Sequence, residues 1–84
     1  MDKKLERIAE LCEKKGPKNV YTELKLSSIC RQVWIFNIDE CGNYDVAKLF
    51  TQTEYNGEVF WTDESNKRVL EEDIIRELEA VRNA

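Results

Sequence analysis

Histidine is absent from this chain of 84 residues, and its three cysteines are far apart in the sequence. Cys12, Cys30 and Cys41 form no CxxC pair, so the sequence offers no usual zinc ligand set, and their odd number does not support a disulfide framework. A thiol nucleophile would also have no histidine to act as its base. We therefore expect no metal, no cofactor and no enzymatic activity, and we interpret the cysteines as structural.

Long apolar runs and clustered cations are also missing. No run approaches the roughly 18 residues of a membrane span, and residues 1–4 lead into a charged amphipathic segment rather than a signal peptide. We therefore expect a cytoplasmic protein that does not enter a membrane. Residues 19–62 contain only Lys25, Arg31 and Lys48 as cations, whereas phosphate binding requires clustered positive charge. The sequence thus argues against direct nucleic-acid binding.

The composition that is present fits a small folded domain. Hydrophobic residues make up 42% of the chain and charged residues 36%, with a net charge of −4. This apolar content exceeds that of disordered chains, and the length fits one core. We predict that residues 1–84 form a single small α+β domain.

The segment 29–62 has the features of a three-stranded antiparallel meander. Asn56-Gly57 fits a two-residue type I′ hairpin loop, because both central positions of that turn need positive φ. Gly42-Asn43 fits a type II′ turn, whose first central position favours glycine. The first turn predicts the pairs Tyr55 with Glu58, Thr53 with Phe60, and Thr51 with Thr62. The second predicts Ile38 with Ala47, Phe36 with Leu49, and Trp34 with Thr51.

Helical segments flank the meander. Residues 3–15 have apolar positions at helical spacing, with Asp2 as a candidate cap, Lys14-Lys15 near the C-terminus and Gly16-Pro17 as a stop signal. Residues 20–27 alternate in polarity and form either a fourth strand or a helical turn before Ser27-Ser28. The polar loop 63–66 offers several N-caps for a second helix. The apolar stripe of that helix comprises Leu70, Ile74, Ile75, Leu78 and Val81.

The two faces of the predicted meander are both apolar. One carries Trp34 and Phe36, and we expect the C-terminal helix to pack there. The other carries Val33 and Ile35, which is unusual for the solvated side of a small sheet. This second face is covered by another helix, or it binds a second copy of the chain or another protein.

The sequence therefore favours a non-enzymatic protein-interaction module, with a homodimer as one form. Large amphipathic side chains are typical of interface hot spots. The predicted protein-binding residues are Val33, Ile35, Phe50, Trp61, Tyr44 and Tyr55.

An acidic inhibitor of a nucleic-acid-processing enzyme is the alternative. In size, net acidity and helix-meander-helix layout, the chain resembles the small inhibitors encoded by phages and other mobile elements. Such an inhibitor would occupy the nucleic-acid-binding groove of its target with carboxylates that replace phosphates. The acidic surface proposed for this role comprises Glu71, Glu72, Asp73, Glu77 and Glu79. Asp39, Glu40 and Asp45 cluster at the first turn and are interpreted as turn formers rather than as a catalytic or metal site.

Overall fold

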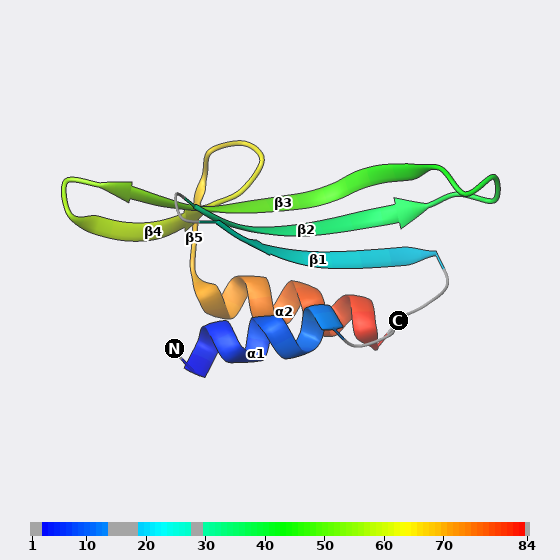
Figure 1. The fold of residues 1–84 in the computed structure, drawn as a ribbon, viewed down its shortest axis with the longest axis horizontal. Helices are drawn as coiled ribbons and strands as arrows, with labels where there is room; N and C mark the ends of the chain where they lie inside the picture. The colour runs from blue at the N-terminus through cyan, green and yellow to red at the C-terminus, as the bar shows by residue number, and fades with distance from the viewer. Residues whose placement is uncertain (1–2, 14–18, 28–29, 84) are drawn as a thin grey trace.

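Two helices and five antiparallel strands make up the described part of the chain in a computed structural model (Figure 1). The structure describes residues 3–13, 19–27 and 30–83. In chain order the elements are α1 (Lys3–Glu13), β1 (Val20–Leu26), β2 (Arg31–Ile38), β3 (Tyr44–Tyr55), β4 (Glu58–Thr62), β5 (Arg68–Val69) and α2 (Glu71–Arg82).

This order confirms the α+β class with a helix at each end, but the sheet has more strands than the three or four predicted. The strands follow one another as β1-β2-β3-β4-β5. The uncertain segment 20–27 forms β1, and β5 was missed because it is only two residues long. Asp2, Lys14-Lys15, Gly16-Pro17 and Ser28 lie outside the described residues, so their predicted roles at helix ends and at a break remain predictions.

Both helices lie on one face of the sheet (Figure 1). We call this the covered face and the opposite side the open face. The prediction that the C-terminal helix packs on Trp34 and Phe36 was wrong, because α2 packs on the covered face instead. The core between the layers comprises Leu5, Ile8, Leu11, Val33, Ile35, Phe50, Trp61, Ile74 and Leu78.

The strand β1 explains which face is covered. Its apolar residues alternate with Tyr21, Glu23 and Lys25, so only one of its faces can be buried cheaply. In the observed register Leu24 lies opposite Val33, on the same side of the sheet. The amphipathic edge strand therefore directs the helices to the Val33 side, although β2 alone is apolar on both sides.

Arg82, near the end of α2, ties three elements together on the covered side. Its Nε donates to the carbonyl of Leu11 at 2.7 Å, and its guanidinium also donates to the Cys12 carbonyl at 3.2 Å. These carbonyls belong to the last turn of α1, and the last carbonyls of a helix need partners from outside the helix. The guanidinium also contacts the hydroxyl of Thr22 in β1, which is buried and donates to the Cys12 carbonyl at 3.1 Å. One cation thus caps α1 and fixes both helices to the sheet.

The β3–β4 hairpin agrees with the prediction. Asn56 and Gly57 have φ of 52° and 80°, and the three predicted residue pairs are observed. Positive φ at both positions is what the type I′ turn requires.

The β2–β3 register was predicted wrongly. Trp34 lies opposite Leu49 rather than Thr51, and a bulge falls between Ile35 and Phe36. The connection is a three-residue loop, Glu40 to Gly42, in which the Gly42 amide donates to the Asp39 carbonyl and Gly42 has φ 84°. This is the geometry of a loop that ends in a left-handed glycine.

Asp39 stabilises that longer loop. Its carboxylate accepts from the backbone N–H groups of Cys41 and Asn43, both at 2.9 Å. These bonds lower the pKa of the Asp39 carboxyl, with the Asn43 backbone N–H making the largest contribution. A two-residue loop at Gly42-Asn43 would lose them, so the side chain selects the loop length.

The loop between β4 and β5 repeats the same arrangement. Asp63 accepts from the backbone N–H groups of Ser65 and Lys67, both at 2.9 Å, and Asn66 takes the left-handed position with φ 63°. The predicted polar loop is confirmed, but it does not cap α2. The helix begins at Glu71, where Asp73 accepts from the N–H of Leu70 at 3.0 Å.

Candidate protein-binding surface

Four of the six predicted interface residues lie in the core. Val33, Ile35, Phe50 and Trp61 are at most 3% exposed beneath the helices. A partner could reach them only if the helices left, so of the two alternatives for this face the structure shows the cover by helices. The physical reason is the polarity of β1, which places the helices on this face.

The other two predicted residues, Tyr44 and Tyr55, are accessible to solvent, but they lie at opposite ends of β3. Tyr44 is 56% exposed at the start of β3 and Tyr55 is 68% exposed at its end, on the hairpin that leads to β4. Only Tyr44 adjoins other aromatic rings.

The open face carries a cluster of four aromatic side chains from three adjacent strands. The rings of Trp34 and Phe36 are stacked, with centroids 5.6 Å apart and an interplanar angle of 6°. Tyr44 meets Phe36 edge-on at 6.0 Å, and Tyr21 lies 5.9 Å from Phe36. Tyr21 and Tyr44 are in turn 5.8 Å apart. We call Tyr21, Trp34, Phe36 and Tyr44 the aromatic cluster.

Polar groups fix part of this cluster. The indole N–H of Trp34 donates to the side-chain carbonyl of Gln32 at 3.3 Å, and the Lys25 ammonium lies 5.0 Å from the centre of the Trp34 ring. A cation over an indole is favourable in partly desolvated positions. Trp34 is thus held in place, whereas Tyr21 and Tyr44 remain more than two-fifths exposed.

A separate aromatic residue lies toward the other end of the open face. The guanidinium of Arg68 lies 4.2 Å from the centre of the Phe60 ring and pairs with Glu58. The open face therefore presents rings with few cations, which suits contact with a protein more than contact with phosphates.

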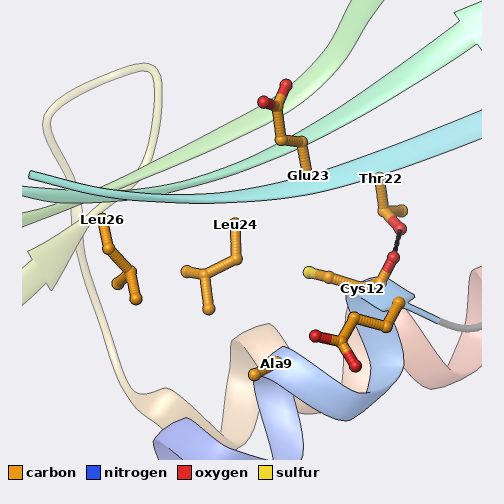
Figure 2. Close-up of a pocket in the computed structure, with 7 residues that line it drawn as sticks. Ala9, Cys12, Thr22, Glu23, Leu24 and Leu26 are labelled. Carbon is orange, nitrogen blue, oxygen red and sulfur yellow. Dashed lines mark hydrogen bonds between the residues drawn. The ribbon is translucent and has the colours of Figure 1, made fainter.

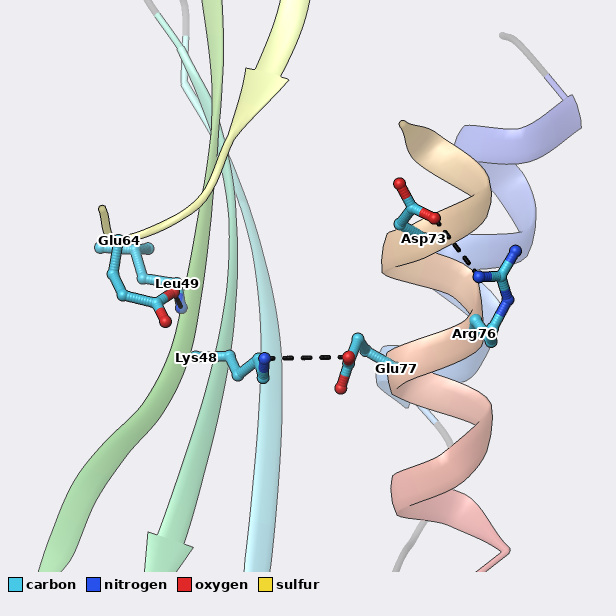
Figure 3. Close-up of polar contacts among 6 residues, drawn as sticks. All are labelled: Lys48, Leu49, Glu64, Asp73, Arg76 and Glu77. Atoms are coloured by element: carbon cyan, nitrogen blue, oxygen red, sulfur yellow. Dashed lines mark hydrogen bonds and ion pairs between the residues drawn. The ribbon is translucent and has the colours of Figure 1, made fainter. Parts of the chain in front are cut away.

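The predicted acidic surface on α2 is largely engaged in contacts within the chain. Glu72 pairs with Lys4 of α1, and Glu77 lies 3.7 Å from Lys48 of β3. Asp73 accepts from Arg76 as well as from the Leu70 N–H. Figure 3 shows Lys48 reaching toward α2, whereas Glu64 and Leu49 lie on the other side of the sheet. Glu71 also has an interaction partner, and Glu79 is half-buried.

A groove of about 290 Å³ lies between α1 and the edge strand β1 (Figure 2). Thr22, Leu24 and Leu26 point toward α1 in this view, and Glu23 points to the opposite side of the sheet. The remaining lining is Ala9, Cys12 and Glu13 from α1.

Cys12 does not make this groove a reactive site. Burial raises the pKa of its thiol to about 11, although Arg82 acts in the opposite direction. The thiol is therefore protonated at neutral pH and is a poor nucleophile. Across the described ranges, no group of three or more histidine, cysteine, aspartate or glutamate side chains is arranged to hold a metal ion.

The sequence prediction included Tyr44 but missed the rest of the aromatic cluster, because it placed Trp34 and Phe36 under a helix. The signal that identifies it is the polarity of residues 20–26. Once this segment is read as a strand, Tyr21, Glu23 and Lys25 mark the solvated side, and the register assigns Phe36 and Trp34 to that side.

Comparisons with protein-family models, curated proteins and solved structures give no match to this chain. Neither of the helices in the described residues is long and apolar enough to cross a membrane.

Proposed function

We propose that this protein is a non-enzymatic interaction module that binds another protein through the open face of its sheet. The observation that carries the proposal is the aromatic cluster, whose tyrosines are exposed on a face that no described helix covers. Contiguous exposed apolar surface marks interaction sites, and tyrosine and tryptophan are enriched among hot spots.

The geometry of the cluster supports binding at low entropic cost. Trp34 and Phe36 are stacked and half-buried, so they lose little freedom when a partner covers them. Tyr21 and Tyr44 add exposed rings with hydroxyl groups that can bond to a partner. The cluster thus resembles a preformed centre for an interface.

The charges near the cluster favour one class of partner. Asp39, Glu40 and Asp45 lie in the adjoining loop and strand end and are exposed, and the chain has a net charge of −4. A partner that fits has an apolar patch bordered by basic side chains, because a complementary rim speeds encounter and excludes acidic competitors.

The test is a titration with the purified partner, which is first isolated on immobilised protein and identified by mass spectrometry. We expect Tyr44→Ala to raise the Kd measured by calorimetry at least tenfold, as for a hot-spot residue. Tyr55→Ala is the matched control, since Tyr55 is at least as exposed as Tyr44 on the same strand but lies at its other end. It should change Kd less than about twofold.

Equal effects of the two substitutions would contradict the proposal. Circular dichroism of both variants establishes that the fold is retained. Phe36→Ala gives a second reading within the cluster, and it too should weaken binding far more than Tyr55→Ala.

The acidic inhibitor is the alternative proposal and has less support, because Glu72, Asp73 and Glu77 already have partners within the chain. It predicts an affinity that falls steeply with added salt. Charge reversal at Glu79 would then weaken binding more than Tyr44→Ala.

A further inference from the structure

The outer edge of β1 is an unpaired sheet edge. The strand pairs with β2 on one side, and no strand among the described residues pairs with its other side. It is seven residues long, and its only charges, Glu23 and Lys25, have opposite signs. Exposed edges of this length readily pair with another strand unless they are blocked.

Two hydrogen bonds show which backbone groups are free for such pairing. The N–H of Ile38 donates to the carbonyl of Asn19, and the N–H of Ser27 donates to the carbonyl of Cys30. In an antiparallel ladder, alternate residues bond to the same neighbour. Odd-numbered residues of β1 therefore bond to β2, and the N–H and C=O groups of Thr22, Leu24 and Leu26 point outward.

The charges of β1 select one way in which two copies can pair. An antiparallel pairing with Leu24 opposite Leu24 of the second copy sets Glu23 opposite Lys25 of that copy, twice by symmetry. If the pairing were instead centred on Glu23, the Glu23 side chains of the two copies would lie opposite each other. Opposite charges in directly facing positions are favourable and like charges unfavourable.

The same register matches the covered side. It places Leu26 of the second copy opposite Thr22, at the groove that Leu24 and Cys12 line. Leu26 is 56% exposed in the single chain, so its burial there removes apolar surface from water. Backbone bonding, charge pairing and apolar contact thus favour a single alignment.

We propose that two copies of this chain associate through their β1 edges, with Leu24 on the two-fold axis, to form one continuous antiparallel sheet. About six backbone hydrogen bonds form, from residues 22, 24 and 26 of each copy. The open faces of both copies then lie on the same side of the continuous sheet. The dimer presents two aromatic clusters on one surface, and of their rings only Tyr21 belongs to the associating strand.

Charge reversal tests the register. Glu23→Lys and Lys25→Glu each create like-charge pairs, and each should raise the dimer Kd about tenfold or more in analytical ultracentrifugation. The double variant restores opposite charges and should return the Kd to within about threefold of the wild type. An equimolar mixture of the two single variants should form a heterodimer, because each lysine then faces a glutamate.

Matched controls separate pairing from net charge. Glu54→Lys changes the charge as Glu23→Lys does, and Lys67→Glu changes it as Lys25→Glu does, at exposed positions outside β1. Both should leave the Kd unchanged. Tyr44→Ala should also leave it unchanged, so loss of partner binding and loss of dimerisation are distinguishable.

Hydrogen exchange provides a reading without mutation. The amides of Thr22, Leu24 and Leu26 should become protected as protein concentration rises, whereas that of Glu23 is protected at all concentrations. A wild type that stays monomeric at millimolar concentration would overturn the proposal. The proposal would also be overturned if both single variants formed dimers with the Kd of the wild type. Amide protection in β1 that does not depend on protein concentration would overturn it as well.

Discussion

The two faces of this sheet both carry apolar residues, but these residues differ in what they contact. The covered face has Val33, Ile35 and Phe50 in contact with helices, and the open face has Trp34 and Phe36 in contact with each other and with two tyrosines. Rings occur on both faces, since Phe50 and Trp61 are buried in the core, so the type of apolar residue does not separate the faces. The polar side chains of β1 do, because they oppose burial of the side that carries Trp34. Apolar content alone therefore does not show which face of a small sheet becomes the core.

Removal of Trp61 is the strongest test of this difference. Trp61 is 3% exposed on the covered face, so Trp61→Ala should lower the free energy of unfolding by about 3 to 5 kcal/mol. Trp34→Ala, on the open face, should lower it by about 1 to 2 kcal/mol, since mainly ring and cation contacts are lost. Urea denaturation followed by circular dichroism measures both. Equal losses would mean that the two faces are equally buried.

The hydrogen bonds made by Arg82 should have the next largest effect on the free energy of unfolding. Arg82→Ala removes the Arg82 donor from the Leu11 carbonyl and one of the two side-chain donors of the Cys12 carbonyl, and we expect a loss of about 2 kcal/mol. Arg82→Lys keeps the charge near the end of α1 but not the forked geometry, so it should recover only part of the loss. Arg76→Ala is the control, because Arg76 is 78% exposed at its side chain and bonds only within α2. If Arg76→Ala lowered the free energy of unfolding by a similar amount, the hydrogen bonds of Arg82 would not explain its effect.

The two aspartate loops give a smaller and more local comparison. Gly42 and Asn66 occupy the same left-handed position, and a Cβ at Gly42 would meet no atom within 4 Å. Gly42→Ala should therefore cost about 1 kcal/mol from backbone strain alone. Asn66→Gly should be neutral or stabilising by a few tenths of a kcal/mol, because it relieves the same strain. Thermal unfolding of both variants measures these changes in stability. If Asn66→Gly lowered the stability as Gly42→Ala does, the two loops would not be equivalent.

These loops also show how far the sequence could be interpreted. Asn56-Gly57 has one dominant turn geometry, so the register of its hairpin was predicted correctly. Gly42 fits more than one loop length, and the choice depends on hydrogen bonds made by Asp39, whose residue type alone is compatible with any turn. Because the predicted loop length was wrong, the predicted partner of Trp34 was wrong as well: the prediction was Thr51, and the structure has Leu49.

The site was harder to predict than the helices. Stripes such as Ile74 and Leu78 identify a buried side within one element, and both residues are fully buried. The face of β2 that stays open is decided by a neighbouring strand and by the helices, which are contacts distant in sequence. The aromatic cluster could therefore be recognised only from the structure, in which Tyr21 of β1 and Tyr44 of β3 lie beside Phe36.

The smallest expected effect concerns the loop that adjoins the aromatic cluster. Hydrogen bonds from Asn43 and Cys41 lower the pKa of the Asp39 carboxyl, so the folded state favours the ionised form. A group whose pKa is depressed on folding contributes stability above its unfolded value, near 4, and that contribution is lost as the pH falls through the folded value.

Nuclear magnetic resonance titration of the Asp39 carboxyl carbon should therefore give a midpoint below the ordinary value of an aspartate. Asn43→Ala removes the side-chain donor but keeps the backbone N–H, so it should raise the Asp39 midpoint only in part. As Asp39 is protonated, the resonances of Tyr44 should shift with the same midpoint, because the loop sets the start of β3. Tyr55 lies on the other hairpin and should show no such shift. A Tyr44 that does not respond would mean that the aromatic cluster holds its end of the open face in place without the loop.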